Sequence, residues 1–138
     1  MAAPADGTRD AFLAETRIGI ITTLQPSGFP SSVPVWFEWD GEVASVFTTS
    51  TSPKVTNLER DSRATLLVVN NVGEPEYWVR IEGTVAISKE GAGELAERLA
   101  NRYWDMSNEG YRATVEEWKQ EPRLRVLELN PTRVTTYP

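Results

Sequence analysis

The chain of 138 residues is long enough to bury the core of one domain, and 20 acidic against 14 basic residues give it a net charge of −6. This acidic balance argues against a nucleic-acid surface, which needs clustered lysine and arginine. The sequence contains no cysteine and no histidine, which excludes disulfides and thiolate catalysis and removes the usual general base and transition-metal ligand. We therefore expect neither a metal site nor a catalytic side chain.

The N-terminal region predicts a loose leader over residues 1–9 that leads into a short helix, Thr8–Glu15, with Asp6 or Thr8 as its N-cap. The leader lacks the basic and apolar stretches of a secretion signal. No apolar run approaches the ~18 residues of a membrane-spanning helix. These features predict a soluble, cytoplasmic protein that does not associate with a membrane.

β-branched and apolar residues predict three strands in succession, over Arg17–Leu24, Ser31–Trp39 and Glu42–Thr49. Pro34 lacks a backbone N–H, so the second strand should lie at a sheet edge, contain a bulge or present an exposed face there. Asp40-Gly41, between the second and third strands, is the strongest hairpin signal in the sequence.

A helix is predicted next, because Ser52 suits the N-cap and Pro53 the first helical position, and this helix should end near Asp61. Two strands should follow it, over Ala64–Val69 and Tyr77–Ser88. The first is apolar enough to be buried on both faces. Gly83, within the second, should mark a bulge or kink.

The last third of the chain predicts two helices and two closing strands. The helices are expected over Glu90–Trp104 and Asn108–Gln120, and the strands over Arg123–Leu129 and Thr132–Tyr137, separated by Asn130-Pro131. In total, about seven strands joined mostly by short turns differ from the strand–helix alternation of a Rossmann-like fold. The pattern predicts a single domain over residues 1–138, an antiparallel barrel with helical inserts.

No phosphate-binding glycine loop, nucleophile elbow or metalloprotease motif is present, which suggests that a cofactor supplies any difficult chemistry. The best candidate site is Thr48–Ser52 with Lys54, where five consecutive hydroxyl side chains lead into a helix N-terminus. Free N–H groups and a lysine there would favour a phosphate. A capped strand-to-helix turn with a surface lysine explains the same residues about as well.

Four motifs occur in an order that resembles one protein superfamily. They are R-I-G-I-I-T-T-L, G-F-P-S-S-V-P-V-W-F-x-W-D-G, T-T-S-T-S-P-K-V-T-N-L-x-R-D-S-R and V-R-I-E-G-T-V, and the resemblance runs over about Phe12–Val134. The order resembles the FMN-binding split barrels, the pyridoxamine-phosphate-oxidase-like oxidoreductases that include deazaflavin-dependent reductases. The resemblance implies a split β-barrel and a homodimer, with two cofactor sites formed across the subunit interface.

The resemblance also implies which residues bind the cofactor. The backbone of one strand would lie along the flavin-type ring, at Val33, Pro34, Val35, Trp36 and Phe37. A polar strand end would lie near the ring and its ribityl chain, at Thr48, Thr49, Ser50 and Thr51. Lys54 would contact the phosphate, and Asn57 belongs to the helix behind it. Trp78 and Arg80 would reach the cofactor that is bound mainly to the other subunit.

The aromatic residues have two interpretations, because five tryptophans are many for a chain of this length. Trp36 and Trp78 could wall a pocket for a planar ring by offset stacking. Trp104 and Trp118 lie on predicted helices, where packing or dimer contacts are the expected role.

One departure from the family pattern narrows the choice of cofactor and reaction. Pyridoxamine-phosphate oxidases carry basic residues in the strand that corresponds to Pro34–Phe37, and this chain has none there. The sequence therefore looks closer to the subgroup that uses the deazaflavin coenzyme F420, with FMN as the alternative because it shares the ring, ribityl chain and phosphate. Arg17, Arg60 and Arg63 are candidates to meet the oligoglutamate tail of the deazaflavin.

The function that follows is hydride transfer between the deazaflavin and a small organic substrate. The first alternative is an FMN-binding flavoprotein. The second is a protein without turnover that binds a flavin-type cofactor or heme, in which a tyrosine would be the remaining common axial ligand for heme.

Overall fold

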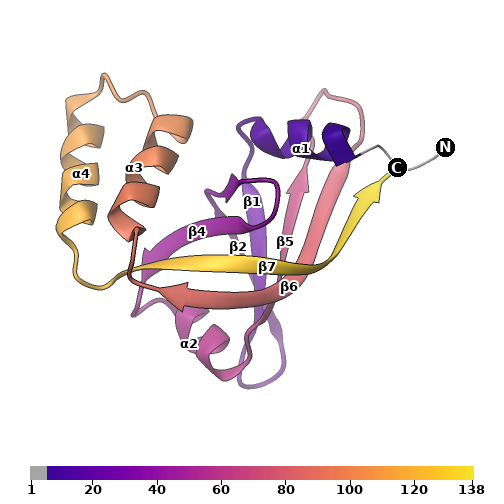
Figure 1. Ribbon diagram of the computed structural model, residues 1–138, viewed down its shortest axis with the longest axis horizontal. Coiled ribbons are helices and arrows are strands. Elements are labelled where there is room, and N and C mark those ends of the chain that lie inside the picture. The colour runs from indigo at the N-terminus through magenta and orange to yellow at the C-terminus, as the bar shows by residue number, and fades with distance from the viewer. Residues whose placement is uncertain (1–5) are drawn as a thin grey trace.

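The structure, a computed structural model, describes residues 6–138, which form a curled sheet with helices at its ends (Figure 1). The helices are α1 (Asp6–Ala14), α2 (Pro53–Arg60), α3 (Ala92–Tyr103) and α4 (Glu109–Gln120). The strands are β1 (Gly19–Leu24), β2 (Pro30–Val35), β3 (Glu38–Trp39), β4 (Ala44–Thr49), β5 (Arg63–Val69), β6 (Trp78–Ser88) and β7 (Leu124–Tyr137). The fold is mainly β with helical inserts, as the sequence predicts. None of the helices in this range is long and apolar enough to cross a membrane.

The seven strands form one antiparallel sheet in the order β2-β1-β5-β6-β7-β4-β3. Its two edge strands, β2 and β3, are consecutive along the chain and are separated only by Trp36 and Phe37. The sheet therefore curls, so that the end of β2 lies close to the start of β3. No ladder joins β2 to β3, so the barrel is split. We call the dipeptide Trp36-Phe37 the seam.

The core of the barrel comes from the alternation of side chains along its strands. On β1, residues Gly19, Ile21 and Thr23 are buried while the residues between them are partly exposed. The largest fully buried side chain is Phe37 of the seam, and Leu13 of α1 packs in the same cluster. The seam thus supplies a central core residue as well as the connection between the sheet edges.

The bulge predicted at Gly83 is confirmed, because the register between β6 and β7 shifts between Glu82 and Gly83. Glu82 pairs with Arg133 and Gly83 with Pro131, so Thr132 is the extra residue on β7. A bulge tolerates a proline that cannot donate to the ladder. The two closing strands predicted on either side of Asn130-Pro131 are therefore one continuous strand.

Two element boundaries and one burial pattern also differ from the prediction. The strand expected over Ser31–Trp39 is interrupted at the seam, where the chain passes from one sheet edge to the other. β5 alternates between buried and partly exposed residues, and Val69 is 43% exposed, because no helix covers the outer face of this antiparallel sheet as it would a parallel one. α1 begins at Asp6, so the loose leader expected over residues 1–9 is helical from there on. Residues 1–5 and the N-cap side chain of Asp6 lie outside the described residues.

The α3–α4 hairpin packs outside the barrel and forms a second hydrophobic cluster (Figure 1). Its buried members come from α3 and from the start of β7, with Leu95, Leu99 and Leu124 among them. Trp36 of the seam packs against this cluster, whereas Phe37 belongs to the barrel core. The two side chains of the seam therefore serve two different clusters.

The glycine at the bulge gives a test of the β6–β7 register. A Cβ at Gly83 would overlap the carbonyl of Asn130 and lie 3.0 Å from Cα of Pro131, so we expect Gly83→Ala to lower the free energy of unfolding by about 1–3 kcal/mol. Gly93→Ala is the control, because a Cβ on this α3 residue meets only Lys119 at ordinary contact distances. It should raise the free energy of unfolding by about 0.5–1 kcal/mol. Urea denaturation measures both, and a Gly83→Ala protein as stable as wild type would contradict the register.

Candidate functional site

A groove of about 480 Å³ lies on the outer side of the sheet beside the seam. The strand side contributes Ile18, Pro34, Val35, Trp36 and Phe47, and the helices and the residue after α3 contribute Lys54, Trp118 and Trp104. Of these eight residues, six have aliphatic or aromatic side chains, and the other two are Pro34 and Lys54. The groove is therefore an apolar cleft with one cationic side chain.

The seam positions Trp36 at this groove. The Trp36 ring stacks on Tyr103 of α3, with centroids 5.1 Å apart and planes 4° apart. The Tyr103 hydroxyl accepts a hydrogen bond from the backbone N–H of Phe37 at 3.3 Å and donates one to the carbonyl of Arg17 at 2.5 Å. Tyr103 thereby fixes both residues of the seam, one by stacking and one through its backbone.

The helical side of the groove is aromatic. Trp104, directly after α3, meets the Trp36 ring edge-to-face at a centroid distance of 4.8 Å. Trp118 of α4 lies 5.3 Å from Trp104 and 5.2 Å from Phe47 of β4, again between ring centroids. These distances are within the range of favourable aromatic pairs. The wall offers the large planar surfaces that suit a conjugated ligand.

The other end of the groove suits an anion. Ser52 occupies the N-cap of α2, as predicted, but its side chain makes no capping hydrogen bond. Ser52 does not itself line the groove but lies two residues before Lys54, which does, and its buried Oγ has no hydrogen-bond partner. Lys54 is partly buried, and this desolvation lowers the pKa of its ammonium group. A buried hydroxyl without a partner and a desolvated ammonium are both costly unless a ligand supplies the missing interactions.

The structure brings some of the predicted binding residues together at this groove. Pro34, Val35, Trp36 and Lys54 line it. Thr48, Thr49, Ser50 and Thr51 end β4 and form the turn to α2, between the lining residues Phe47 and Lys54, and the hydroxyls of Thr49 and Thr51 lie 3.2 Å apart. β2 is an edge strand and Pro34 is exposed on it, as expected. One side of the β2 backbone thus remains unpaired by the sheet.

Other predicted residues point into the protein. Phe37 is fully buried in the core, and Val33 packs against the same cluster. Asn57 is buried and donates a hydrogen bond from Nδ2 to the hydroxyl of Thr23 at 3.1 Å, which ties α2 to β1. The side chains of these three residues do not line the groove.

Trp78 and Arg80 stand apart from the groove. They lie on β6, which follows β2, β1 and β5 in the sheet order, and neither lines the groove. Trp78 stacks on Tyr137 at a centroid distance of 5.9 Å, and the Arg80 guanidinium lies 5.7 Å from the centre of the Trp78 ring. These two residues therefore lie outside the groove of their own chain, and a role across a subunit interface stays a prediction.

The sequence analysis missed four lining residues: Ile18, Phe47, Trp104 and Trp118. Phe47 could have been found, because it directly precedes the polar strand end and shares its outward face with Thr49. Trp104 and Trp118 were expected to pack or to form dimer contacts. They do pack, but they also line the groove, and only the docking of the α3–α4 hairpin on Trp36 reveals it.

The sequence profile of the family described as pyridoxamine 5'-phosphate oxidase matches residues 6–137. The chain belongs to this family. The sequence is also similar to the F420H(2)-dependent biliverdin reductase of Mycobacterium tuberculosis (strain CDC 1551 / Oshkosh), to which it is 32% identical over 97 residues. The match covers 67% of this chain and 68% of the relative. The resemblance to pyridoxamine-phosphate-oxidase-like oxidoreductases is thus confirmed.

Two solved structures share the fold of this family member. An F420 reductase matches with a TM-score of 0.77 at 22% sequence identity, and the match covers 91% of this chain and 94% of that chain. A heme-binding protein from Mycobacterium smegmatis matches with a TM-score of 0.73 at 17% identity, covering 99% of this chain and 55% of that chain. The family is one of flavin- and deazaflavin-dependent oxidoreductases, and its split-barrel fold also occurs in a heme-binding protein.

The groove has the features that a phosphate-bearing, ring-containing cofactor requires. Ser52 and Lys54 offer a hydroxyl and a cation for the phosphate, and the edge of β2 offers backbone groups for a polar ring. The aromatic wall makes the helical side of the groove apolar, beyond the part that would hold the phosphate.

The burial of Lys54 leads to a prediction for the protein without ligand. A lowered pKa means that the ammonium group destabilises the folded state below its folded-state pKa, and this penalty disappears as the pH rises to the ordinary lysine value of about 10.4. Lys54→Met should therefore raise the free energy of unfolding at pH 7, and the gain should shrink toward pH 10. Urea denaturation at both pH values measures the effect, with the exposed Lys89→Met as the control. A Lys54→Met protein less stable than wild type at pH 7 would mean that the lysine stabilises the fold itself.

Proposed function

We propose that the protein is a deazaflavin-dependent reductase that uses coenzyme F420 and transfers hydride between it and a small organic substrate. The observation that carries the proposal is the composition of the groove beside the seam. One end offers the desolvated Lys54, with the unpartnered Ser52 hydroxyl buried close behind it in the chain, and the other offers stacked tryptophans. The match to an F420H(2)-dependent reductase over two thirds of the chain supports the deazaflavin.

Each group of residues would contact a different part of the cofactor. Lys54 and Ser52 would hold the phosphate, and Thr48–Thr51 would lie along the ribityl chain. The free edge of β2, from Val33 to Val35, and the backbone of Trp36 would hydrogen-bond the polar edge of the ring, whereas the Phe37 N–H is already bonded to Tyr103. The chemistry that the bound cofactor supplies is hydride transfer, in which two electrons and one proton pass to the acceptor and a second proton comes from solvent.

The deazaflavin tail gives a reason to prefer it over FMN. Arg60 lies in the last turn of α2, about 9 Å along the helix axis from Lys54. It is exposed and already donates a hydrogen bond to the carbonyl of Leu24. Arg63 is exposed and paired with Asp61. Arg17, in contrast, is 5% exposed and held by Glu15 and Glu74, so the tail would meet Arg60 and Arg63.

The cofactor assignment predicts a difference between two ligands. The deazaflavin should bind more tightly than FMN in isothermal titration calorimetry, and the difference should shrink as salt rises, because exposed charges are screened beyond about 8–10 Å. Lys54→Met should weaken the binding of both ligands by ~1.5–3 kcal/mol, the value for a hydrogen bond to a charged group. Lys89→Met should leave both affinities unchanged.

The outcomes separate the alternatives. FMN that binds equally well at low salt, or that copurifies in stoichiometric amount, would make the protein an FMN-binding flavoprotein. Tight deazaflavin binding without oxidation of the reduced coenzyme by any acceptor tested would favour a carrier without turnover. A Soret band on heme titration with no deazaflavin binding would identify a heme-binding member of the fold.

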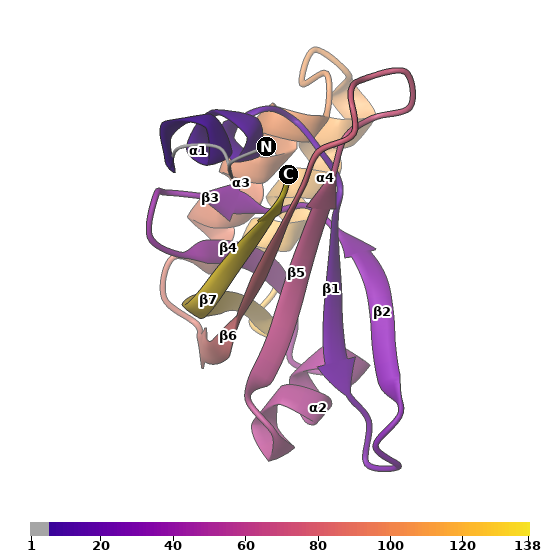
Figure 2. The same cartoon turned by 90° about the vertical axis from the view of Figure 1, so that its right-hand side faces the viewer.

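We also propose that the protein is a homodimer. The outer face of β1, β5 and β6 carries partly exposed apolar side chains, among them Ile20, Leu67 and Trp78. No helix lies over the middle of this face in the described chain (Figure 2). An uncovered apolar sheet face is suited to a partner. A second copy there would bring Trp78 and Arg80 toward the partner's groove, as the family resemblance implies.

Light scattering at micromolar concentration tests the dimer. The mass should be about twice 15.4 kDa. Val69→Arg places a charge on the face, where Val69 is 43% exposed, and should produce a monomer because burying an unpaired charge is costly. Val72→Arg is the matched control, since Val72 is fully exposed in the β5–β6 loop. A wild-type monomer that binds the cofactor with normal affinity would overturn the proposal.

A further inference from the structure

The α3–α4 hairpin places two tryptophan side chains, Trp104 and Trp118, at the groove. Val115 is the buried residue of α4, and the helix packs mainly on α3. Trp118 of the same helix nevertheless reaches the groove, with its ring 5.2 Å from Phe47 of β4. α4 therefore has few buried residues, and its largest side chain, Trp118, lies at the groove.

Trp104 and Trp118 belong to one stacked aromatic cluster beside the groove. Their rings stack with centroids 5.3 Å apart, and Tyr111 supports Trp104 from α4 at 4.2 Å with planes 15° apart. Trp36 of the seam meets both rings edge-to-face. This support restricts the two indoles, so a ligand that stacks against them would not have to order them first.

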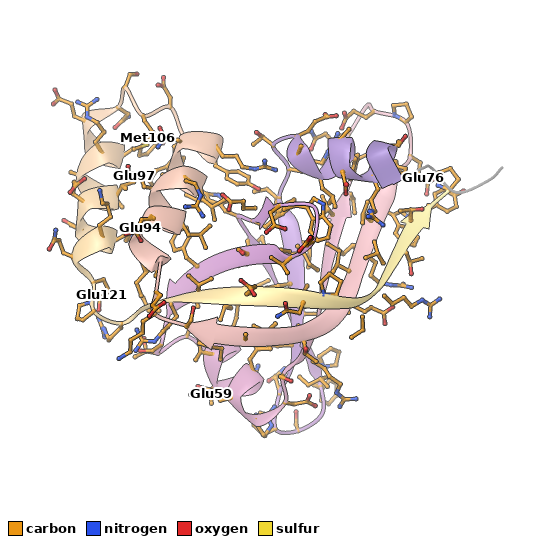
Figure 3. The ribbon with its side chains drawn as sticks, viewed as in Figure 1. Glu59, Glu76, Glu94, Glu97, Met106 and Glu121 are labelled. Carbon is orange, nitrogen blue, oxygen red and sulfur yellow. The ribbon has the colours of Figure 1, made fainter. Side chains whose placement is uncertain are left out.

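Charge distinguishes this end of the groove from the Lys54 end. Within the part of the chain that the structure describes, Lys54 is the only charged residue that lines the groove. The hairpin carries Glu94 and Glu97 on α3 and Glu121 directly after α4 (Figure 3), but Lys119 pairs with Glu97 and Arg123 pairs with Glu121, so these carboxylates bring cations with them. Once a cofactor phosphate is bound at Lys54 and Ser52, the tryptophan wall offers ring faces and no cation.

We propose that Trp104 and Trp118 form the acceptor subsite, and that this subsite selects an uncharged, planar, conjugated ring. The inference rests on the proposed function, because it assigns the barrel to the cofactor and the hairpin to the acceptor. Biliverdin, the substrate in the name of the M. tuberculosis relative, carries two carboxylates. Among the described residues, no second cation lines the groove to pair with them, so the two proteins would differ in acceptor charge.

Two naphthoquinones of nearly equal size test the subsite. Menadione is neutral, and lawsone, a hydroxynaphthoquinone, is an anion at neutral pH. Equilibrium dialysis against the wild-type protein loaded with the deazaflavin should show menadione binding at least tenfold more tightly than lawsone. Equal affinities, or a preference for lawsone, would overturn the inference without the need for any variant.

Variants of Trp118 test the residue itself. Trp118→Leu should weaken menadione binding about tenfold and raise its KM by the same factor with little change in kcat, because an aromatic surface is lost. Trp118→Phe should retain most of the affinity. The Kd for the deazaflavin, measured by calorimetry, should change less than twofold in both variants. A folded Trp118→Leu protein with unchanged menadione affinity would overturn the assignment.

The two proposals fail in different ways. If menadione binding depends on Trp118 but the protein does not bind the deazaflavin, the proposed function fails and the ring-binding subsite stands. If Lys54-dependent deazaflavin binding is observed while Trp118 has no effect on menadione, the proposed function stands and the subsite is wrong. If Trp118→Leu does not fold, as judged by circular dichroism, the comparison of menadione with lawsone in wild type decides.

Discussion

The seam between the two sheet edges is the constraint on which the rest of the structure depends. β2 and β3 lie at opposite edges of the sheet, yet only Trp36 and Phe37 separate them along the chain. A connection of two residues forces the sheet to curl, because it reaches only about 10 Å. Successive side chains of an extended dipeptide point to opposite sides. Phe37 therefore fills the barrel while Trp36 faces the helical hairpin.

The residues at the end of α3 hold this seam in place. Tyr103 stacks on Trp36 and hydrogen-bonds the backbone of Phe37 and Arg17. Its neighbour Arg102 donates hydrogen bonds to the carbonyls of Leu13, Ala14 and Glu15 at 2.6–3.0 Å, where the last carbonyls of α1 have no partners within the helix. Two adjacent side chains thus connect the hairpin to α1, to Arg17 just before β1, and to the seam. The groove exists because the hairpin is docked there.

The anion end of the groove illustrates how a binding site reduces stability. The Ser52 hydroxyl has no partner, and burial disfavours the charged form of Lys54. The buried Asn57, one turn further along α2, in contrast makes a hydrogen bond to Thr23. The same short helix therefore has a structural side that is satisfied and a ligand side that is not. That asymmetry is what a phosphate site needs in a protein without its ligand.

The sequence by itself determined the features that depend on neighbouring residues. Asp40-Gly41 marked a turn, Ser52-Pro53 the start of α2, and Gly83 a bulge, because backbone conformation at these positions depends on the local residue type. Lys54 was recognised as a candidate for the same reason, since its place in the first helical turn follows from the N-cap.

The tertiary structure alone decided what depends on distant contacts. The interruption at Trp36-Phe37 follows from the curl of the whole sheet. The presence of Trp104 and Trp118 in the groove follows from the docking of the hairpin some 70–80 residues further along the chain from the seam. The pattern of one helix tells which of its faces is apolar, but not which surface that face will meet. That choice is made by long-range packing, which no local pattern encodes.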